Sequence, residues 1–430
     1  MIEVSPVVER AILVAAPPSN EPQALVDEHL EELERLVDTA GAEVSGMLVQ
    51  RVTSPHSAFY IGSGKVDQLR LLAESNEATL IVFDEDLTPA QGSALEKRLG
   101  IRVMDRTEVI LDIFALRART AESRVQVELA QLQYLRTRLK RMWTHLSRTQ
   151  GGIGMRGPGE TQLETDRRII DRRIARLRRE LKHIQKSRET RRQGRGDSLQ
   201  LTLVGYTNAG KSSLLKALSG TDVFVEDRLF ATLDSATRSV TLGDGYAALI
   251  TDTVGFIRKL PHHLVASFRA TLEEVQRADL LLHVIDSSSP SWEHQVDAVN
   301  EVLASLESLD RPTLLVFNKV DQLTHVEEKA LSARAEGMSE PSVLTSVREP
   351  GGLDTLVAAL CDKARAQRPT VIVTLPVTDG RLLAEAYRES EVLERLDGAA
   401  TIQITVRVPL AVLGRWRRHP NIRIVEQDAA

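Results

Sequence analysis

The stretch Gly205-Tyr206-Thr207-Asn208-Ala209-Gly210-Lys211-Ser212 decides the fold of this chain. It follows an apolar run, Leu199–Val204, and precedes a helical pattern, Leu214–Leu218. Between a strand and a helix, this glycine spacing is typical of a loop whose backbone N–H groups cradle phosphates. In such a loop Lys211 neutralises charge on the β- and γ-phosphates, and Ser212 is a ligand of Mg²⁺. The sequence therefore predicts an α/β domain built around a P-loop.

Two later motifs follow this loop in the order that a nucleotide hydrolase needs. In Asp252-Thr253-Val254-Gly255, the acidic residue can hold the Mg²⁺ shell and the Gly255 N–H can sense the γ-phosphate. We expect Lys211 and Gly255 to act in catalysis. In Asn318-Lys319-Val320-Asp321, the Asp321 carboxylate can accept two hydrogen bonds from guanine, a donor pair that adenine lacks. The three motifs together predict a GTP-hydrolysing enzyme.

The rest of the chain separates into further regions. From Glu9 to about Thr107, apolar runs alternate with helical patterns, which predicts a small α/β domain with a parallel sheet. After the P-loop domain, the pattern reads strand, helix over Gly380–Leu396, strand and a short basic helix. We predict an N-terminal α/β subdomain, a long antiparallel helical hairpin, a P-loop GTPase domain and a small C-terminal α/β domain, over residues 1–112, 113–196, 197–367 and 368–430.

The predicted hairpin has an apolar seam, a glycine-rich tip and a strong basic charge. The seam of its second helix steps by four and three residues through Ile170, Ile174, Leu177, Leu181 and Ile184. The tip, Gly151–Gly159, contains five glycines, more than a plain turn needs. From Arg117 to Arg195 there are 22 Lys and Arg against 8 Asp and Glu, although the whole chain carries −5. Such clustering indicates a polyanionic partner.

Composition excludes several classes of protein. With 42% apolar and 27% charged residues, the chain resembles a folded globular protein rather than a disordered or collagenous one. No apolar run reaches the roughly 18–20 residues of a membrane span, and Met1–Ser5 does not resemble a secretory signal. The single cysteine, Cys361, lies in a helical pattern where we expect a buried, unreactive thiol. We expect a cytoplasmic protein without stable membrane insertion.

The motifs resemble those of a known family. The P-loop, Asp-Thr-Val-Gly and Asn-Lys-Val-Asp motifs resemble translation-factor-class GTPases, and Gly151–Arg168 is similar to the signature of the HflX family. Tyr60–Lys65 and Leu111–Phe114 also resemble that family, so the likeness covers nearly the whole chain. The resemblance implies a monomeric GTPase that binds the large ribosomal subunit and its rRNA. It also implies that the helical domain is pushed toward the peptidyl-transferase region, where it can split stalled ribosomes.

The resemblance also assigns roles to individual residues. Phe230-Ala231-Thr232-Leu233-Asp234 resembles the first switch of the family, which makes Thr232 a catalytic residue and, with Ser212, an Mg²⁺ ligand. Ser235-Ala236 stands where the family has Pro-Thr. Ser346-Val347-Arg348 stands where the family has a Ser-Ala pair that assists guanine binding; because a backbone N–H contact survives such a change, we expect GTP specificity to be retained.

Several interpretations stay open at the level of sequence. Phe256 occupies the position where Ras-like enzymes carry a water-orienting Gln, which predicts slow intrinsic hydrolysis and an external activator, unless another residue positions the water. Asn208 resembles a K⁺ ligand of potassium-stimulated GTPases, although a structural hydrogen bond is favoured. Gly62-Ser63-Gly64-Lys65 is an alternative accessory nucleotide site, and Arg415–His419 is either an RNA contact or a solvated helix face.

The main functional prediction has one rival from another class. A nucleotide-dependent binding switch could act on a different RNA or protein partner and hydrolyse GTP only to reset. The same P-loop and the same basic hairpin fit both hypotheses. Nucleotide-dependent association with large ribosomal subunits discriminates between them.

Overall fold

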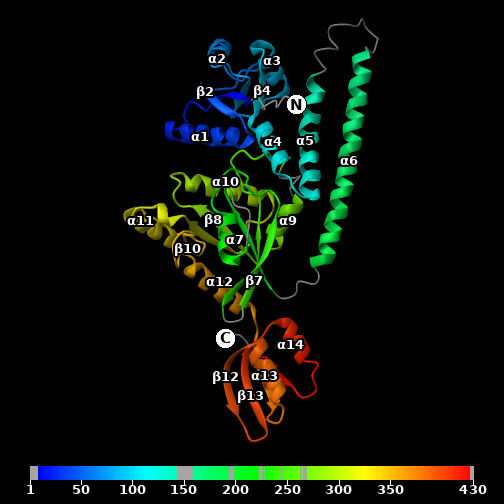
Figure 1. The fold of residues 1–430 in the computed structure, drawn as a ribbon, viewed down its shortest axis with the longest axis vertical. Helices are drawn as coiled ribbons and strands as arrows, with labels where there is room; N and C mark the ends of the chain where they lie inside the picture. Colours follow the sequence, from blue (N-terminus) through cyan, green and yellow to red (C-terminus); the bar gives the residue numbers. More distant parts are fainter. Residues whose placement is uncertain are drawn as a thin grey trace, which may run out of the picture. The chain divides into compact units, whose positions relative to one another are not determined.

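The computed structural model (Figure 1) describes residues 8–142, 158–192, 198–221, 226, 228–243, 246–261, 264 and 269–426. The chain divides into two compact units. The first unit comprises residues 1–185, 226–234 and 259–270, and the second comprises residues 186–225, 235–258 and 271–430. Two short segments of the predicted GTPase domain therefore pack with the N-terminal unit.

The N-terminal domain is built on a parallel sheet, as predicted. Its strands, in the order β2-β1-β3-β4, are β1 (Arg10–Ala15), β2 (Glu43–Val49), β3 (Leu80–Phe83) and β4 (Arg102–Asp105). The two central strands are almost entirely apolar and buried, as expected for a sheet covered on both faces. Because β2 lies on one side of β1 and β3 on the other, the strand order reverses between β1 and β3.

Four helices connect and cover these strands: α1 (Gln23–Ala40), α2 (Ser63–Ser75), α3 (Pro89–Leu99) and α4 (Arg106–Arg117). The start of α3 follows from its sequence, because Thr88 and Gln91 form a reciprocal capping box before the helix. Helix α4 runs across residues 112 and 113, where the sequence predicted a domain boundary. Its Phe114 is only 1% exposed, so α4 belongs to the core of this unit.

The hairpin consists of α5 (Ala121–Met142) and α6 (Pro158–Arg192), which lie side by side in Figure 1. Its predicted seam is present as a buried cluster of Val125, Leu129, Ile174, Leu177 and Leu181. The early residues of α5 meet the later residues of α6, which makes the pair antiparallel. No helix in the described part of the chain is long and apolar enough to cross a membrane.

The predicted tip and the predicted linker of the hairpin fall mostly outside the described residues. Residues 151–157 of the tip and 193–197 of the linker are among those that the structure does not describe. Pro158 and Gly159 were predicted to belong to the tip loop, but they form the start of α6. Proline is well suited to the first turn of a helix, because its missing N–H needs no partner there.

The P-loop domain contains a six-stranded mixed sheet in the order β10-β9-β8-β5-β7-β6. Only β6 pairs in the antiparallel sense. The strands are β5 (Leu199–Gly205), β6 (Ala236–Gly243), β7 (Tyr246–Asp252), β8 (Leu280–Asp286), β9 (Thr313–Asn318) and β10 (Ser342–Leu344). They alternate with α7 (Lys211–Ser219), α9 (Arg269–Arg277), α10 (Trp292–Ser305), the 3₁₀ turn η1 (Val320–Gln322), α11 (His325–Glu336) and α12 (Asp354–Gln367).

Both faces of this sheet are covered by helices. One buried cluster joins Val284 and Val316 of the sheet to residues of α7 and α12, among them Cys361, whose predicted burial is confirmed. A second cluster joins the alternate positions Ile285 and Phe317 to residues of α10 and α11. Alternate residues of β8 and β9 thus face opposite layers, which is the arrangement of a doubly wound α/β domain.

The C-terminal domain is a small antiparallel sheet in the order β12-β13-β11-β14, with two helices. Its elements are β11 (Thr370–Pro376), α13 (Gly380–Glu389), β12 (Glu391–Asp397), β13 (Thr401–Arg407), α14 (Leu410–Trp416) and β14 (Arg423–Glu426). The predicted helix over Gly380–Leu396 is wrong in its last third, because residues 391–397 pair with β13 as a strand. Tertiary pairing outweighs the helical propensity of this stretch.

Candidate functional site: the nucleotide-binding loop and its neighbours

The P-loop lies at the carboxyl end of β5, where two glycines permit a path that other residues would block. Gly205 has φ +147°, and a Cβ there would lie 2.2 Å from the carbonyl oxygen of Val284. Gly210 has φ +96°, and a Cβ there would lie 2.2 Å from the Asn318 side-chain nitrogen. The loop is therefore held against β8 and β9 at distances that only glycine allows.

Lys211, the first residue of α7, is buried at the centre of the loop. Its ammonium donates hydrogen bonds to the carbonyl oxygens of Gly205, at 3.0 Å, and Tyr206, at 2.7 Å. Burial lowers the pKa of Lys211 to about 8, although the nearby charge of Asp252 opposes this shift. A buried ammonium surrounded by backbone carbonyls is well placed to meet the negative charge of a polyphosphate.

Ser212 and Asp252 form the predicted metal-binding corner. The Ser212 hydroxyl donates a hydrogen bond to Asp252 Oδ2 at 2.6 Å, and the Asp252 side chain is fully buried. Thr253, the next residue, donates to the carbonyl oxygen of Leu203 at 2.7 Å, which fixes the motif against β5. A hydroxyl and a carboxylate this close are the hard oxygen ligands that Mg²⁺ prefers, so these residues fit the predicted ion.

The Asp-Thr-Val-Gly motif is joined to the P-loop by backbone contacts. Phe256 donates its N–H to the Gly205 carbonyl at 3.1 Å and accepts from the Thr207 N–H at 2.7 Å. A Cβ on Gly255 would lie 2.8 Å from the Thr207 Cα and 3.1 Å from the Lys211 ammonium. The Phe256 ring is fully buried. Gly255 therefore lies beside the phosphate loop, while the adjacent aromatic ring is directed into the core.

The predicted guanine motif also lies against the loop. The Asn318 amide donates to the Ala209 carbonyl at 2.9 Å, and Lys319, with φ +65°, pairs with Asp286 at 2.5 Å. Ser346 is 1% exposed and donates its hydroxyl to Asp321 Oδ1 at 2.7 Å. The structure thus brings Ser346 to the carboxylate that is predicted to read the base.

Ser346 also organises the turn that carries Val347 and Arg348. Its Oγ accepts the N–H groups of Arg348, at 3.1 Å, and Glu349, at 3.2 Å. The Arg348 guanidinium lies 4.0 Å from Asp321 and is largely exposed. These contacts fix the turn next to Asp321 whatever residue follows Ser346, because they use the serine hydroxyl and the backbone.

The predicted first switch, residues 230–234, packs within the N-terminal unit. Phe230 is 2% exposed and meets the Phe114 ring edge-on, with ring centroids 4.8 Å apart. Its φ of +53° is unusual for a bulky residue, so packing must offset a backbone cost. Leu233 is buried as well, whereas Ala231 and Thr232 are half-buried. The segment is therefore held by apolar anchors on either side of Thr232.

Asp234 makes a contact that sequence reasoning missed. Its Oδ1 accepts the Thr120 hydroxyl at 2.6 Å, and its Oδ2 accepts the N–H groups of Arg119 and Thr120, both at 3.3 Å. Thr120 directly precedes α5 and caps it by accepting the N–H of Ser123 at 3.1 Å. A Thr before a helix is a recognisable capping signal, but its partner lies 114 residues away and leaves no local pattern.

His283 on β8 is a second feature that the sequence did not reveal. Its side chain is 2% exposed, and burial, together with the nearby Lys211 charge, lowers its pKa to about 4. The imidazole is therefore neutral at physiological pH. An isolated His within an apolar strand gives no sequence signal of this kind.

Two alternative sites from the sequence show ordinary structural roles in their geometry. Gly62 precedes α2 with φ −63°, and its N–H donates to Gln50 Oε1 at 3.0 Å. In α14, Trp416 is buried in the C-terminal core, while Arg415 forms an ion pair with Glu389. Gly62, Arg415 and Trp416 thus contact residues of their own domains.

Comparison with known sequence families agrees with this arrangement. Residues 27–115 match the model of the family described as "GTP-binding GTPase N-terminal", and residues 117–195 match "GTP-binding GTPase Middle Region". Residues 200–319 match the family "50S ribosome-binding GTPase". The three matches follow one another along the chain and cover the N-terminal domain, the hairpin and much of the P-loop domain.

Individual relatives cover nearly the whole chain. A GTPase HflX from Magnetococcus marinus is 44% identical over 96% of this chain and 96% of its own length. A GTPase HflX from Escherichia coli is 43% identical over 91% of each chain. Among solved structures, a GTP-binding protein from Sulfolobus solfataricus in complex with GDP is 24% identical, with a TM-score of 0.44, over 83% of this chain and 99% of that one. On the sequence identities alone, the chain belongs to the HflX family of P-loop GTPases.

Proposed function

We propose that this GTPase binds the large ribosomal subunit in its GTP-bound state and uses its basic hairpin to split or remodel stalled ribosomes. It would act as a monomer in the cytoplasm. The observation that carries the proposal is the contact of Asp234 with Thr120, which ties the predicted first switch to the start of hairpin helix α5. A rearrangement of the switch on nucleotide binding would then alter the contacts of Thr120, which caps the first turn of α5. The name of the matching family, "50S ribosome-binding GTPase", motivates the choice of partner.

The chain's own groups suggest how GTP would be held. Lys211 would turn from the loop carbonyls to the β- and γ-phosphates, while Ser212 and Thr232 would be protein ligands of Mg²⁺ and Asp252 would support its outer shell. When bound, Mg²⁺ would neutralise charge on the phosphate oxygens. Gly255 would offer its N–H to the γ-phosphate. Each of these roles uses an atom that lies at or beside the loop, except that of Thr232, which is assigned by family resemblance.

Recognition of guanine would rest on Asp321. Its carboxylate can accept from N1–H and from the 2-amino group of guanine, and Ser346 already bonds one of its oxygens. That bond would fix the plane of the carboxylate before the base arrives. Asn318 would stabilise the site indirectly through its bond to the loop at Ala209. The remaining members of the motif, Lys319 and Val320, would shape the turn.

Hydrolysis would need help from outside the chain. Phe256 is fully buried and has no hydrogen-bonding side chain, so it cannot orient the attacking water. We infer that intrinsic turnover is slow and that the ribosome completes the site. Asn208 occupies a position that resembles a K⁺ ligand of potassium-stimulated GTPases, and a comparison of turnover in K⁺ and Na⁺ salts would detect a K⁺ contribution.

The test is nucleotide-dependent comigration with large ribosomal subunits in a gradient at fixed salt, followed by splitting of whole ribosomes monitored by light scattering. Binding with a non-hydrolysable GTP analogue but not with GDP is the expected result. Lys211→Ala is the matched negative control, because it removes the ammonium that meets the phosphates. Binding that is equal with both nucleotides, or equal in the variant, would favour a switch acting on another RNA or protein partner.

A further inference from the structure

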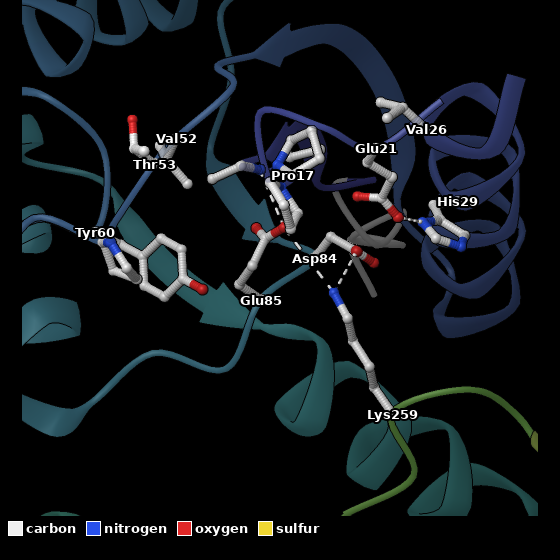
Figure 2. Close-up of a pocket in the computed structure, with 14 residues that line it drawn as sticks. Pro17, Glu21, Val26, His29, Val52, Thr53, Tyr60, Asp84, Glu85 and Lys259 are labelled. Atoms are coloured by element: carbon white, nitrogen blue, oxygen red, sulfur yellow. Dashed lines mark hydrogen bonds and ion pairs between the residues drawn. The ribbon is translucent and has the colours of Figure 1, made fainter. Parts of the chain in front are cut away.

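A cavity of about 350 Å³ lies in the N-terminal domain at the carboxyl ends of β1 and β3 (Figure 2). Residues 15–18 at the end of β1 form one wall, and Asp84 and Glu85, which follow β3, form another. The strand order reverses between these two strands. In open parallel α/β sheets, ligands bind at such a reversal, outside the carboxyl ends of the strands. The cavity therefore lies where this topology places a ligand.

The cavity already holds one ammonium group, which comes from the chain itself. The Lys259 ammonium lies 3.0 Å from Asp84 Oδ2 and 4.0 Å from Glu85 Oε1. Figure 2 shows the Lys259 side chain reaching these two carboxylates from the rim. The Lys259 side chain remains 45% exposed, and its backbone has φ +52°, an uncommon value for a residue other than glycine. The Lys259 ammonium is therefore only partly buried at the site, and the positive φ of its backbone costs conformational energy.

The carboxylates at this wall share two cations among the described residues. Arg106 pairs with both Asp84, at 3.1 Å, and Glu32, and Lys259 is the second cation of the group. Arg106 thus pairs with Asp84 and Glu32, whereas Lys259 lies beside Asp84 and Glu85. Burial, reinforced by the neighbouring Asp84, raises the pKa of Glu85 to about 7.

Glu85 is incompletely satisfied as well. It is 7% exposed, and its Oε1 accepts the N–H of Ala16 at 3.0 Å. Its Oε2 is buried and has no hydrogen-bond partner among the described residues. A buried carboxylate oxygen without a donor is costly, and the Lys259 ammonium, 4.0 Å from the other oxygen, attracts the charge but is too distant to donate a hydrogen bond.

We propose that this cavity is a binding site for a small organic ammonium ion, whose ammonium group takes the place of the Lys259 ammonium between Asp84 and Glu85. The ligand's carbon chain would lie against the apolar wall formed by Pro17, Val26 and Val52. The ligand displaces a half-exposed lysine, which costs little desolvation, and provides the donor that Glu85 lacks. A phosphate-bearing ligand is disfavoured, because acidic groups dominate this wall.

The site is linked by the chain to the nucleotide motifs. Lys259 follows Gly255 by four residues and Phe256 by three. Displacing Lys259 from the carboxylates removes one restraint on the residues that follow the Asp-Thr-Val-Gly motif. Occupancy of the cavity therefore adjusts the restraint on that segment, independently of any ribosome.

The test uses n-butylammonium, which has the length of a lysine side chain, with 1-butanol and butyrate as isosteric neutral and anionic probes. Binding to the full-length protein is followed by ligand-observed NMR at constant ionic strength. We expect saturable binding of n-butylammonium alone. Lys259→Ala, which removes the competing ammonium, should tighten it at least tenfold, whereas the matched exposed lysine variant Lys329→Ala should leave it unchanged.

Two further variants make the outcome decisive. Glu85→Gln keeps the acceptor for Ala16 but removes the charge, and it should weaken n-butylammonium binding at least tenfold. Should that variant fold poorly in a thermal unfolding control, Thr53→Trp, at an exposed position lining the cavity, should block binding without touching the carboxylates. Equal binding of the three probes, no saturable binding to the parent, or no gain in Lys259→Ala would overturn the proposal.

Discussion

At the scale of single residues, the buried side chain of His283 makes the stability of the fold depend on pH. Its folded pKa of about 4 lies below the value near 6.5 of an unfolded histidine. Between these values the unfolded chain binds a proton that the folded chain does not. Stability is therefore lost as the pH falls from about 6.5 toward 4.

We predict that His283→Leu reduces this acid sensitivity. The change in the free energy of unfolding between pH 7 and pH 4.5 should become smaller by about 2 kcal/mol, since one titrating group is removed. Chemical denaturation at both pH values measures it. His325→Leu, at a position that is largely exposed, is the matched control for the loss of a histidine. An unchanged slope in His283→Leu would show that other groups dominate acid unfolding.

Asp321 gives a prediction about specificity. In Asp321→Asn, the amide offers one acceptor and a donor, so it cannot accept both hydrogen bonds from guanine, whereas it can pair with xanthine. We expect GTP binding to weaken at least a hundredfold and xanthosine triphosphate to become the better ligand. Competition against a fluorescent nucleotide measures both. Asp310→Asn, an exposed change in the same domain, serves as the control; identical competition profiles in Asp321→Asn and the parent would contradict the assignment.

At the scale of elements, the junction between the first switch and α5 is the contact to test. Asp234→Ala removes the acceptor of the Thr120 hydroxyl and of two backbone N–H groups. Amide exchange at the start of α5 should accelerate about tenfold, as expected from losing roughly 1.4 kcal/mol of local stabilisation. Hydrogen exchange of peptides covering residues 117–126 measures it. The same protection in the variant and the parent would mean that Asp234 does not brace the helix.

A matched control for this junction lies in the other helix of the hairpin. Glu164→Ala removes an exposed carboxylate that pairs with Arg168 one turn away in α6. Such exposed pairs contribute little, so exchange at the start of α5 should stay at the parent value. The comparison separates loss of this particular acceptor from a general loss of negative charge.

The tip of the hairpin gives the second prediction at this scale. Replacing residues 151–157 with a short Gly-Ser turn should leave GTP affinity within about twofold, because the described loop and seam residues lie elsewhere. Ribosome splitting followed by light scattering should be lost, since the proposed function needs the tip to compete for space. Full splitting activity of the shortened protein would show that the tip serves only to connect the two helices of the hairpin.

The C-terminal elements show where local pattern stops being informative. The stretch after Gly380 is rich in Leu, Glu and Arg, which favours a helix, and α13 does begin there. From Glu391, pairing with β13 and the hydrogen bond from Tyr246 to Glu391 specify a strand instead. The parallel strands near the N-terminus were predictable because each is an apolar run of its own, whereas β12 depends on a partner reached only in the folded chain.

The candidate site was predictable to a similar extent. The P-loop is a single contiguous stretch of sequence, and so is the guanine motif. One turn at the end of a strand then places several functional groups at once, so both motifs could be recognised from sequence. Contacts of Asp234 with Thr120 and of Lys259 with Asp84 join segments more than 100 residues apart. No spacing rule connects such residues, so they needed the three-dimensional structure.

At the scale of the whole molecule, charge is distributed very unevenly. The chain carries −5 in total, yet the stretch 117–195 has 22 basic against 8 acidic residues. Several of its arginines, among them Arg172 and Arg176, are exposed on α6. The acidic remainder opposes general adhesion to nucleic acid, so binding of a polyanion should be directed to the hairpin.

We predict that the affinity for large ribosomal subunits falls steeply with salt and that these arginines set the slope. Replacing Arg172 and Arg176 with Gln should reduce the slope of log K against log salt by about one for each phosphate that the variant no longer neutralises. Binding measured across a series of KCl concentrations gives the slope. Arg311→Gln with Lys329→Gln, both exposed in the P-loop domain, removes the same charge elsewhere and should preserve it.

The assignment of residues 226–234 to the N-terminal unit bears on what can be inherited or excised as a module. A polypeptide cut to residues 197–367 would contain Phe230 without Phe114 and Asp234 without Thr120. Such a fragment lacks the groups that hold the predicted first switch, so we expect its basal turnover to differ from that of the parent. We expect an exchange of the nucleotide-binding module between relatives to preserve these contacts only when it also carries α4 and the start of α5.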